Sequence, residues 1–226
     1  MAEEKLTHDF GYGKVPAHQH PNGGGWVADT AKVDANSRVT DNSVVTGNSV
    51  VTGNSVVTGN SWVVGNSRVD NSQVTGNSRV TDNSQVTGNS WVTGNSRVTD
   101  NSQVTGNSVV TGNSRVDNSV VTGNSRVTDN SQVTGNSWVT GNSWVDNSVV
   151  EHTNEVLAIA PIGSRNATLT ITSKPHLQFT TGCFTGTKEE FIAAITKTHG
   201  DNDYAKAYLL AIEFAEKYFA LQKVAK

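Results

Sequence analysis

Valine recurs at a fixed interval along the middle of the chain, and this spacing predicts short, repeated β-strands. From Val27 to Val150 there are 22 such valines; 18 of the 21 intervals between them are six residues and three are five. In each repeated x-Val-Thr triplet the valine points to one side of the chain and its neighbours to the other, as strand geometry requires. The Gly-Asn or Asp-Asn pair that follows predicts a turn, because these residues tolerate a positive φ.

Strands this short, all turning the same way after the same number of residues, must coil. Each strand then stacks on the strand three units later, at a spacing of ~4.8 Å, and the small serine of each unit occupies the crowded corner. With three units per coil, 22 units predict about seven coils. The three five-residue units, which start at Val69, Val116 and Val145, all read Val-Asp-Asn-Ser. The same corner of the unit is shortened each time, so we expect a tightened corner there and a retained strand.

The repeat resembles the bacterial transferase hexapeptide repeat, in which an aliphatic residue is followed four positions later by a small one, as Val45 is by Ser49. The resemblance covers roughly residues 26–151. It implies a left-handed parallel β-helix with a triangular cross-section, an exception to the usual right-handed crossover. It also implies acyltransferase activity, as in many members, γ-class carbonic anhydrase activity, as in some, and packing as trimers along flat faces.

We therefore predict a mainly β chain in three parts. An irregular N-terminal cap covers residues 1–25, the left-handed β-helix covers 26–152, and a C-terminal α+β domain of short strands and two helices covers 153–226. The near identity of the repeats indicates either a recent tandem duplication or a consensus-designed insert.

Composition and charge narrow the classes of function. Hydrophobic residues make up 35% of the chain and charged residues 16%, a mix that signals disorder where apolar residues lack such regular spacing. The net charge of −3 and the pI near 6.0 predict no general attraction to nucleic acid or anionic membranes. The single Cys183 excludes an internal disulfide framework and a multi-cysteine metal site. Without an apolar run of membrane-spanning length or a signal peptide, we expect a cytoplasmic protein that needs no cofactor.

The residues that precede the valines fall into three outward columns. The first column carries Trp26, Val44, Trp62, Arg79, Arg97, Arg115, Gln132 and Val149. Within it Trp62, Arg79, Arg97 and Arg115 form a candidate site for an anionic or nucleotide-like ligand, with guanidinium groups for phosphate and an indole for stacking. Outward tryptophans also mark interfaces, so we expect a homo-oligomer, with a trimer favoured.

A second interpretation of the arginines is local neutralisation. All six repeats that contain arginine carry an aspartate shortly afterwards: Arg38 and Asp41, Arg68 and Asp70, Arg79 and Asp82, Arg97 and Asp100, Arg115 and Asp117, Arg126 and Asp129. This pattern indicates either electrostatic pairing or inheritance of one duplicated cassette.

The coils lack the residues that hexapeptide-repeat enzymes use for chemistry. Acyl transfer and carbonic anhydrase activity in that family rely on histidine as general base or zinc ligand, and no His, Cys or Lys lies between Asn36 and Val150. An acyltransferase would need a base from the flanks, His20 or His152. Two histidines, His18 and His20, are too few to indicate a metal site, and their Pro- and Gly-rich surroundings predict a loop that caps the solenoid.

After His152 the composition changes and predicts a small α+β unit. Strands are expected at Val156–Ile162, Ala167–Thr172 and Leu177–Thr181. A capping-box sequence at Thr187 opens a helix that runs to about His199 and is closed by Gly200. A second helix is expected at roughly Asp203–Lys223. Its residues at helical spacing are predicted to lie in the core: Tyr204, Tyr208, Ala211, Ala215 and Tyr218.

Three residues of this unit, Arg165, Cys183 and His199, are further site candidates, although a lone cysteine before a phenylalanine is typical of a buried small side chain. The blocks HPNGGGWVADTA, GCFTGTKEEF and THGDN resemble flanking segments of uncharacterised phage-encoded hexapeptide-repeat proteins. That likeness implies no established activity and a location in the cytoplasm of a bacterial host.

The sequence thus predicts a non-enzymatic structural or binding protein, a β-helical spacer with a C-terminal recognition or assembly domain. The first alternative is an oligomer that sequesters an anionic or nucleotide-like ligand on its Arg/Trp face. The second is a hexapeptide-repeat acyltransferase. The third is an ice-binding protein, because the third face carries an uninterrupted column of threonines: Thr40, Thr58, Thr75, Thr93, Thr111 and Thr128.

Overall fold

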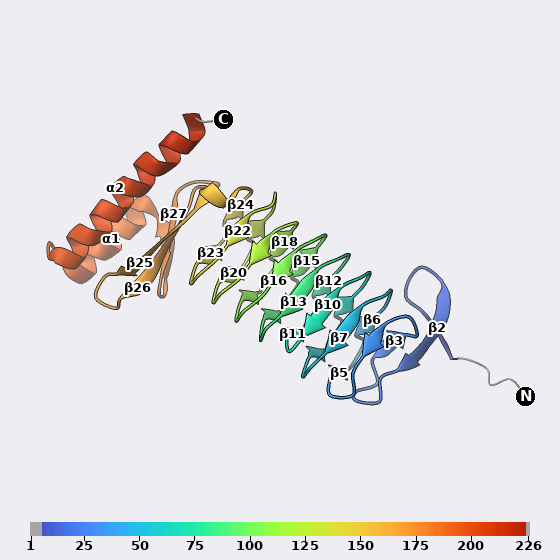
Figure 1. Cartoon of the computed structure of the whole chain (residues 1–226). Coiled ribbons are helices and arrows are strands. Elements are labelled where there is room, and N and C mark those ends of the chain that lie inside the picture. The colour runs from blue at the N-terminus through green and yellow to red at the C-terminus, as the bar shows by residue number, and fades with distance from the viewer. Residues whose placement is uncertain (1–5, 225–226) are drawn as a thin grey trace, which may run out of the picture.

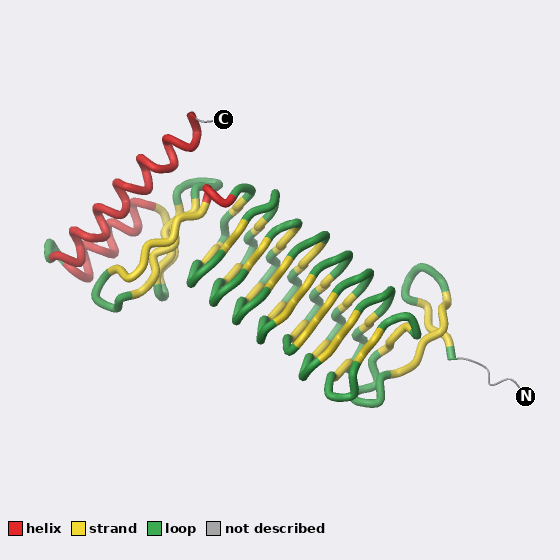
Figure 2. Tube along the Cα trace, viewed as in Figure 1, coloured by secondary structure: helices red, strands yellow, loops and turns green. Residues whose placement is uncertain are grey.

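The computed structural model describes residues 6–224, and its main feature is a solenoid of about seven turns of stacked parallel strands. An N-terminal hairpin lies at one end of the stack and a small sheet with two helices lies at the other (Figure 1). Each strand of a coil pairs in parallel with the strand three places later in the chain, and turns join the strands at the edges (Figure 2). The predicted β-helix with three units per coil is confirmed.

Three sheets form the sides of the solenoid, and the observed register reproduces the three outward columns. Sheet 1 contains β3 (Trp26–Ala28), β6 (Val44–Val45), β9 (Trp62–Val63), β12 (Arg79–Val80), β15 (Arg97–Thr99), β18 (Arg115–Asp117), β21 (Gln132–Val133) and β24 (Val149–Val150). Sheet 2 contains β4 (Lys32–Val33), β7 (Val50–Thr52), β10 (Arg68–Asp70), β13 (Gln85–Thr87), β16 (Gln103–Val104), β19 (Val120–Val121) and β22 (Trp138–Val139). Sheet 3 contains β5 (Arg38–Val39), β8 (Val56–Val57), β11 (Gln73–Val74), β14 (Trp91–Val92), β17 (Val109–Val110), β20 (Arg126–Thr128) and β23 (Trp144–Asp146).

The core of the solenoid consists of the repeated valines. From Val39 to Val150 every one of them is completely buried, and burial of a valine side chain contributes roughly 1.5–3 kcal/mol. The corner serines are buried as well, and apart from that of Ser96 their hydroxyls form hydrogen bonds, mostly to backbone carbonyls, as Ser67 Oγ does to the carbonyl of Val64 at 2.8 Å. A larger side chain at these serines would have no room, which explains why the repeat keeps the small residue.

Two kinds of corner connect the strands. In a six-residue unit the Gly or Asp before Asn takes the positive φ, for example 70° at Gly47 and 57° at Asp41. In the three five-residue units the asparagine itself takes it, with φ of 49° at Asn71, 49° at Asn118 and 45° at Asn147. The strands on both sides of each short corner are present, so the predicted tightening is confirmed.

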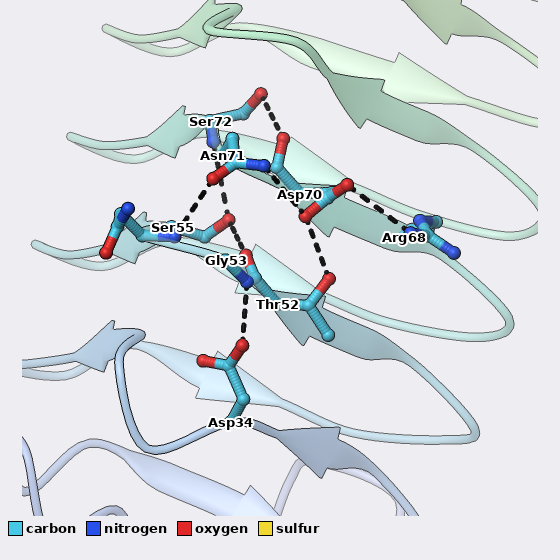
Figure 3. A network of polar contacts seen from close by, with 9 residues as sticks. Asp34, Thr52, Gly53, Ser55, Arg68, Asp70, Asn71 and Ser72 are labelled. Carbon is cyan, nitrogen blue, oxygen red and sulfur yellow. Dashed lines mark hydrogen bonds and ion pairs between the residues drawn. The ribbon is translucent and has the colours of Figure 1, made fainter.

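The three short corners lie on three different edges of the solenoid, one between each pair of sheets, although the same corner of the unit is shortened each time. Figure 3 shows the first of them. There the Thr52 hydroxyl of the preceding coil donates to Asp70 Oδ1 at 3.0 Å, and the amide of Gly53 donates to Asp34 Oδ2 at 2.7 Å. Because each edge loses one residue once, the shortening is shared among all three sides of the stack.

The N-terminal segment is more regular than predicted. Its strands β1 (Thr7–Asp9) and β2 (Lys14–Gln19) form an antiparallel hairpin, and β2 pairs with β3 at the edge of sheet 1. The expectation of an irregular segment over 1–25 is therefore wrong for these two strands, and residues 1–5 of that range lie outside the described residues. The following loop covers the start of sheet 3, where the amide of Gly25 donates to the carbonyl of Val39 at 2.8 Å.

The C-terminal unit is a four-stranded antiparallel sheet covered by two helices. A short 3-10 helix, η1 (Thr153–Glu155), leads into β25 (Val156–Ile162), β26 (Ala167–Thr172), β27 (Gln178–Thr181) and β28 (Phe184–Thr187), which pair in that order. The helices α1 (Lys188–His199) and α2 (Asp203–Val224) follow, and they lie on the side of the sheet away from the coils (Figure 1). The predicted capping box at Thr187 and the helix end at Gly200 are confirmed.

Alternation along β26 and β27 joins this unit to the last coil. Leu169, Ile171 and Phe179 belong to the apolar core shared with the helices. The residues between them carry hydroxyls toward the coils: Thr170 Oγ1 accepts from the amide of Trp144 at 2.9 Å, and Thr172 Oγ1 lies 2.7 Å from Ser148 Oγ. One face of the sheet therefore closes the solenoid and the other face builds a second core.

Two predictions about side chains in this unit are wrong. Tyr204 is 48% exposed, while Tyr208, Ala211 and Ala215 are buried as expected. Cys183 is exposed, because it lies in the two-residue turn between β27 and β28 and not within a strand.

Candidate functional site

The structure brings the predicted ligand-binding residues together in one column of sheet 1. Trp62 pairs with Arg79, Arg79 with Arg97, and Arg97 with Arg115 across four neighbouring strands, β9, β12, β15 and β18. Because neighbouring strands are ~4.8 Å apart, the three guanidinium groups stand on consecutive coils. The grouping that the three-unit coil predicts is confirmed as a geometric arrangement.

The four side chains of this column differ in what they contact. The guanidinium carbon of Arg79 lies 5.1 Å from the centre of the Trp62 ring, a cation–π contact. Arg115 Nη2 forms an ion pair with Asp117 Oδ2 at 2.7 Å. Arg97 has neither an ion pair nor a ring contact within residues 6–224. Trp62 is therefore occupied by Arg79, and Arg97 is the guanidinium that a ligand would meet first.

An open polar depression of about 430 Å³ lies beside Arg97 and Arg115. Its other lining residues are Asn95, Asn113, Ser114, Asn130 and Gln132. The negative charges of Asp100 and Asp117 oppose anion binding near these arginines. Asp117 raises the pKa of Asp100 through a hydrogen bond and its charge. The depression thus offers side-chain amide donors and the guanidinium of Arg97, which has no ion pair, while the nearby aspartates offset much of the positive charge.

Pairing of every arginine with the next aspartate is wrong for most repeats. Among the described residues, ion pairs form in only two of the six, Arg68 with Asp70 at 3.3 Å and Arg115 with Asp117 at 2.7 Å. Both belong to five-residue units, in which the aspartate follows the arginine by two positions and so lies on the same face of the strand. In the six-residue units the aspartate is three positions on, at the turn, and no ion pair forms.

Asparagine ladders along the edges are a feature that the sequence analysis missed. On the edge from sheet 3 to sheet 1 each side-chain amide donates to the next asparagine, from Asn42 through Asn60, Asn77, Asn95, Asn113 and Asn130 to Asn147, over 2.9–3.3 Å. A second ladder runs from Asn48 to Asn136 on the next edge. The turn propensity of Asn concealed this second role, although its strict 17- or 18-residue recurrence indicates it.

The threonine column of sheet 3 is partly engaged within the protein. Thr40 Oγ1 donates to Thr58 Oγ1 at 2.6 Å, and Thr58 Oγ1 donates to Asp41 at 2.6 Å. Thr128 is buried beneath Trp144, whose Nε1 donates to it at 2.9 Å. These hydroxyls are bound to neighbours and form no open array, which weighs against the ice-binding alternative.

The histidines singled out as candidate bases or ligands are held locally. His18 Nδ1 lies 3.1 Å from Asp29 Oδ1, and the buried His20 accepts from the amide of Asn22 at 3.3 Å. Over the described part of the chain, no group of three or more His, Cys, Asp or Glu side chains is arranged to hold a metal ion. His152 precedes η1 at the end of the coils.

The structure unites two of the three C-terminal candidates. Arg165 and His199 line one small hollow on the helix side of the C-terminal sheet, whereas Cys183 is not among the lining residues. Arg165 comes from the turn between β25 and β26, and His199 is the last residue of α1.

Comparisons of the chain with family models, with curated proteins and with solved structures give no match. Within the described residues, no helix is both long and apolar enough to cross a bilayer.

Proposed function

We propose that the protein is a non-enzymatic structural protein, a rigid β-helical spacer that holds the C-terminal unit at a fixed distance and orientation from the N-terminal hairpin. The observation that carries the proposal is the unbroken stack of three parallel sheets, attached to folded elements at both ends (Figure 1). About seven coils at ~4.8 Å each separate these ends by roughly 30 Å.

Rigidity follows from how each coil contacts the next one. Fully buried valines fill the axis, and backbone hydrogen bonds join neighbouring coils on three sides. Side-chain amide ladders run along two edges and, from Asn107 to Asn142, along part of the third. The last coil is fixed to the C-terminal sheet by the Thr170 and Thr172 contacts and by Gln178, whose side chain donates to the carbonyl of Asp146 at 3.0 Å. A rotation of the C-terminal unit would break these buried hydrogen bonds, so its orientation follows that of the coils.

Electron spin labels can test the spacer directly. The native Cys183 and a cysteine introduced by Lys14→Cys are both at exposed positions at opposite ends. We expect one narrow distance distribution between the labels. Deletion of residues 95–112 removes one whole coil and joins Gly94 to Asn113 at equivalent corners, so the mean distance falls by at most the ~4.8 Å rise of one coil, with the width unchanged.

A single-unit deletion provides the matched control. Removal of residues 107–112 moves every later strand onto the preceding face, so the C-terminal unit turns by a third of a coil about the axis and the label distance no longer follows the one-coil rule. A broad distribution in the parent protein, or a mean that does not change after removal of residues 95–112, contradicts a rigid spacer.

Sequestration of a small anion is the second candidate function, supported by the unpaired Arg97 beside the depression of about 430 Å³. In calorimetric titrations with inorganic phosphate and adenosine monophosphate, this function requires binding that Arg97→Gln abolishes and Arg38→Gln, on sheet 3, leaves intact. Absence of binding to the parent protein excludes anion sequestration for these probes.

We also propose that the protein forms homo-oligomers through Trp91 and Trp138, which are 49% and 57% exposed. Sedimentation measurements test this part of the proposal.

A further inference from the structure

The small hollow in the C-terminal unit is lined by cationic, hydroxyl and aromatic groups. It has a volume of about 90 Å³ and lies between β27, β28 and the two helices. Phe184, Phe191 and Tyr208 form apolar walls, and Arg165 and His199 stand at the rim. This volume is well below the roughly 300–1,000 Å³ of a pocket for a drug-sized ligand, so it suits a head group of a few atoms and is too small for a nucleotide.

The Arg165 side chain is held over a glycine. A Cβ atom added to Gly182 would lie 2.3 Å from Arg165 Nη2 and 2.8 Å from its Cζ, so the guanidinium rests directly on the backbone of the turn between β27 and β28. Arg165 has no ion pair among residues 6–224. Its planar set of donors is therefore exposed and available for an acceptor.

Thr181 supplies the second, independent observation. The residue is 5% exposed, and its buried hydroxyl has no hydrogen-bond partner within the described chain. Thr181 lies two positions after Phe179 on β27, on the face that meets the helices, and it lines the hollow. A buried hydroxyl without a partner costs about 1–3 kcal/mol, and a ligand that accepts from this hydroxyl would remove that cost.

We propose that this hollow binds a carboxylate group with a short apolar body. A carboxylate accepts two parallel hydrogen bonds from one guanidinium, and its second set of lone pairs can accept from Thr181. The ring of Phe184 provides contact for the carbons next to it. One guanidinium and one imidazole suit a monoanion better than a doubly charged phosphate. The inference does not depend on the coils acting as a spacer, because binding at the hollow is measured by itself.

Nuclear magnetic resonance titration of the full chain tests the proposal. The probes are propionate, a tripeptide with a free C-terminal carboxylate, the same tripeptide as its amide, and inorganic phosphate, with sodium chloride to match ionic strength. We expect saturable shifts of Thr181 and His199 signals with propionate. Tighter binding of the free-acid tripeptide than of propionate would identify a polypeptide C-terminus as the source of the carboxylate, and the reverse would identify a free acid.

Three variants locate the binding. Arg165→Gln, at an exposed turn position, should weaken propionate binding about tenfold or more because it removes a charge-assisted hydrogen bond. Thr181→Val should weaken binding several-fold while the free protein becomes no less stable, since a buried unpaired hydroxyl is removed. Cys183→Ser, exposed and outside the lining, should have no effect.

The proposal is overturned by several results. They are the absence of saturable shifts with both propionate and the free-acid tripeptide, affinity within twofold of the parent in Arg165→Gln, or equal weakening by Cys183→Ser. Phosphate binding more tightly than propionate would overturn the assignment to a carboxylate.

Discussion

Alanine in place of Gly106 or Gly141 separates two reasons for a glycine at the corners of this solenoid. Both residues follow threonine in a six-residue unit and have nearly the same left-handed backbone, with φ of 76° and 71°. They differ in what lies above them. A Cβ atom on Gly106 would lie 2.5 Å from the carbonyl oxygen of Gly123 on the next coil, whereas a Cβ atom on Gly141, at the end of the stack, would have no atom within 4 Å.

The magnitudes follow from these two environments. The left-handed conformation costs a residue with a Cβ atom about 1–2 kcal/mol, and this cost applies to both variants. Overpacking against a backbone atom adds about 1–3 kcal/mol at Gly106 alone. We therefore expect Gly141→Ala to lower the free energy of unfolding by about 1–2 kcal/mol and Gly106→Ala by about 2–5 kcal/mol.

Denaturant unfolding followed by circular dichroism measures both values. Gly106→Asp serves as the internal control, because natural aspartates occupy the same corner position at lower φ, such as 65° at Asp82 and 59° at Asp100. It should cost less than Gly106→Ala, since aspartate tolerates this conformation better. Equal losses for Gly106→Ala and Gly141→Ala would refute the argument that the stacked corner, and not the backbone conformation alone, requires glycine.

Two further predictions concern carboxyl groups whose environments shift the pKa in opposite directions. Hydrogen bonds from the Thr58 hydroxyl and the Gly59 amide lower the pKa of Asp41, so Asp41→Asn should reduce stability at pH 7 and the difference should vanish as the pH falls through that lowered pKa. Asp117 raises the pKa of Asp100 through a hydrogen bond and its charge, so the ionised Asp100 opposes folding at neutral pH. Asp100→Asn should therefore raise stability at pH 7 and have little effect at pH 3. Thermal unfolding of both variants at the two pH values is the measurement, and stability changes of equal sign at pH 7 would contradict these two predictions. At Glu155, burial raises the pKa, but hydrogen bonds from Lys174 and from the amides of Glu151 and His152 outweigh it and lower the pKa. Glu155→Gln should therefore lower the free energy of unfolding by about 1–3 kcal/mol at pH 7. The parent protein should lose this advantage as the pH falls below about 4.3 and through the lowered pKa of Glu155. A difference in unfolding free energy between the two proteins that stays constant from pH 7 to pH 3 would show the reasoning to be wrong.

The repeat made most of the solenoid predictable, because its period leaves few alternatives. Valine at every sixth position determines which side chains are buried, and three units per coil determine which outward residues share a sheet. The contacts between outward side chains were less predictable, because they depend on whether a unit has five or six residues. Arg115 meets Asp117 because its unit has five residues, whereas Arg97 does not meet Asp100 in a unit of six.

The C-terminal unit shows where local sequence carries less information. Capping residues specified α1 at both ends, and alternating apolar residues specified β25 and β26. Strand β28 (Phe184–Thr187) reads Phe-Thr-Gly-Thr, whose glycine and single apolar residue do not indicate a strand. It forms because β27 offers an unpaired edge after a two-residue turn, and the same turn places Cys183 in solvent. Arg165 and His199 line the same hollow because of this tertiary arrangement, and nothing in their sequence spacing indicates it.

The two ends of the stack determine where the solenoid stops, which the repeats themselves do not. Any coil of this protein could stack on any other, so nothing within the repeat limits the number of coils or prevents two molecules from stacking end to end. The structure closes both ends with different devices. At the N-terminal end, the antiparallel β2 occupies the edge of sheet 1 and the Gly25 amide bonds to β5. At the C-terminal end, Thr170 occupies the amide of Trp144 and the carbonyl of Lys174 accepts from the amide of Val149. Length is therefore set by the count of repeats between two closures, which is the property that a spacer of defined length requires.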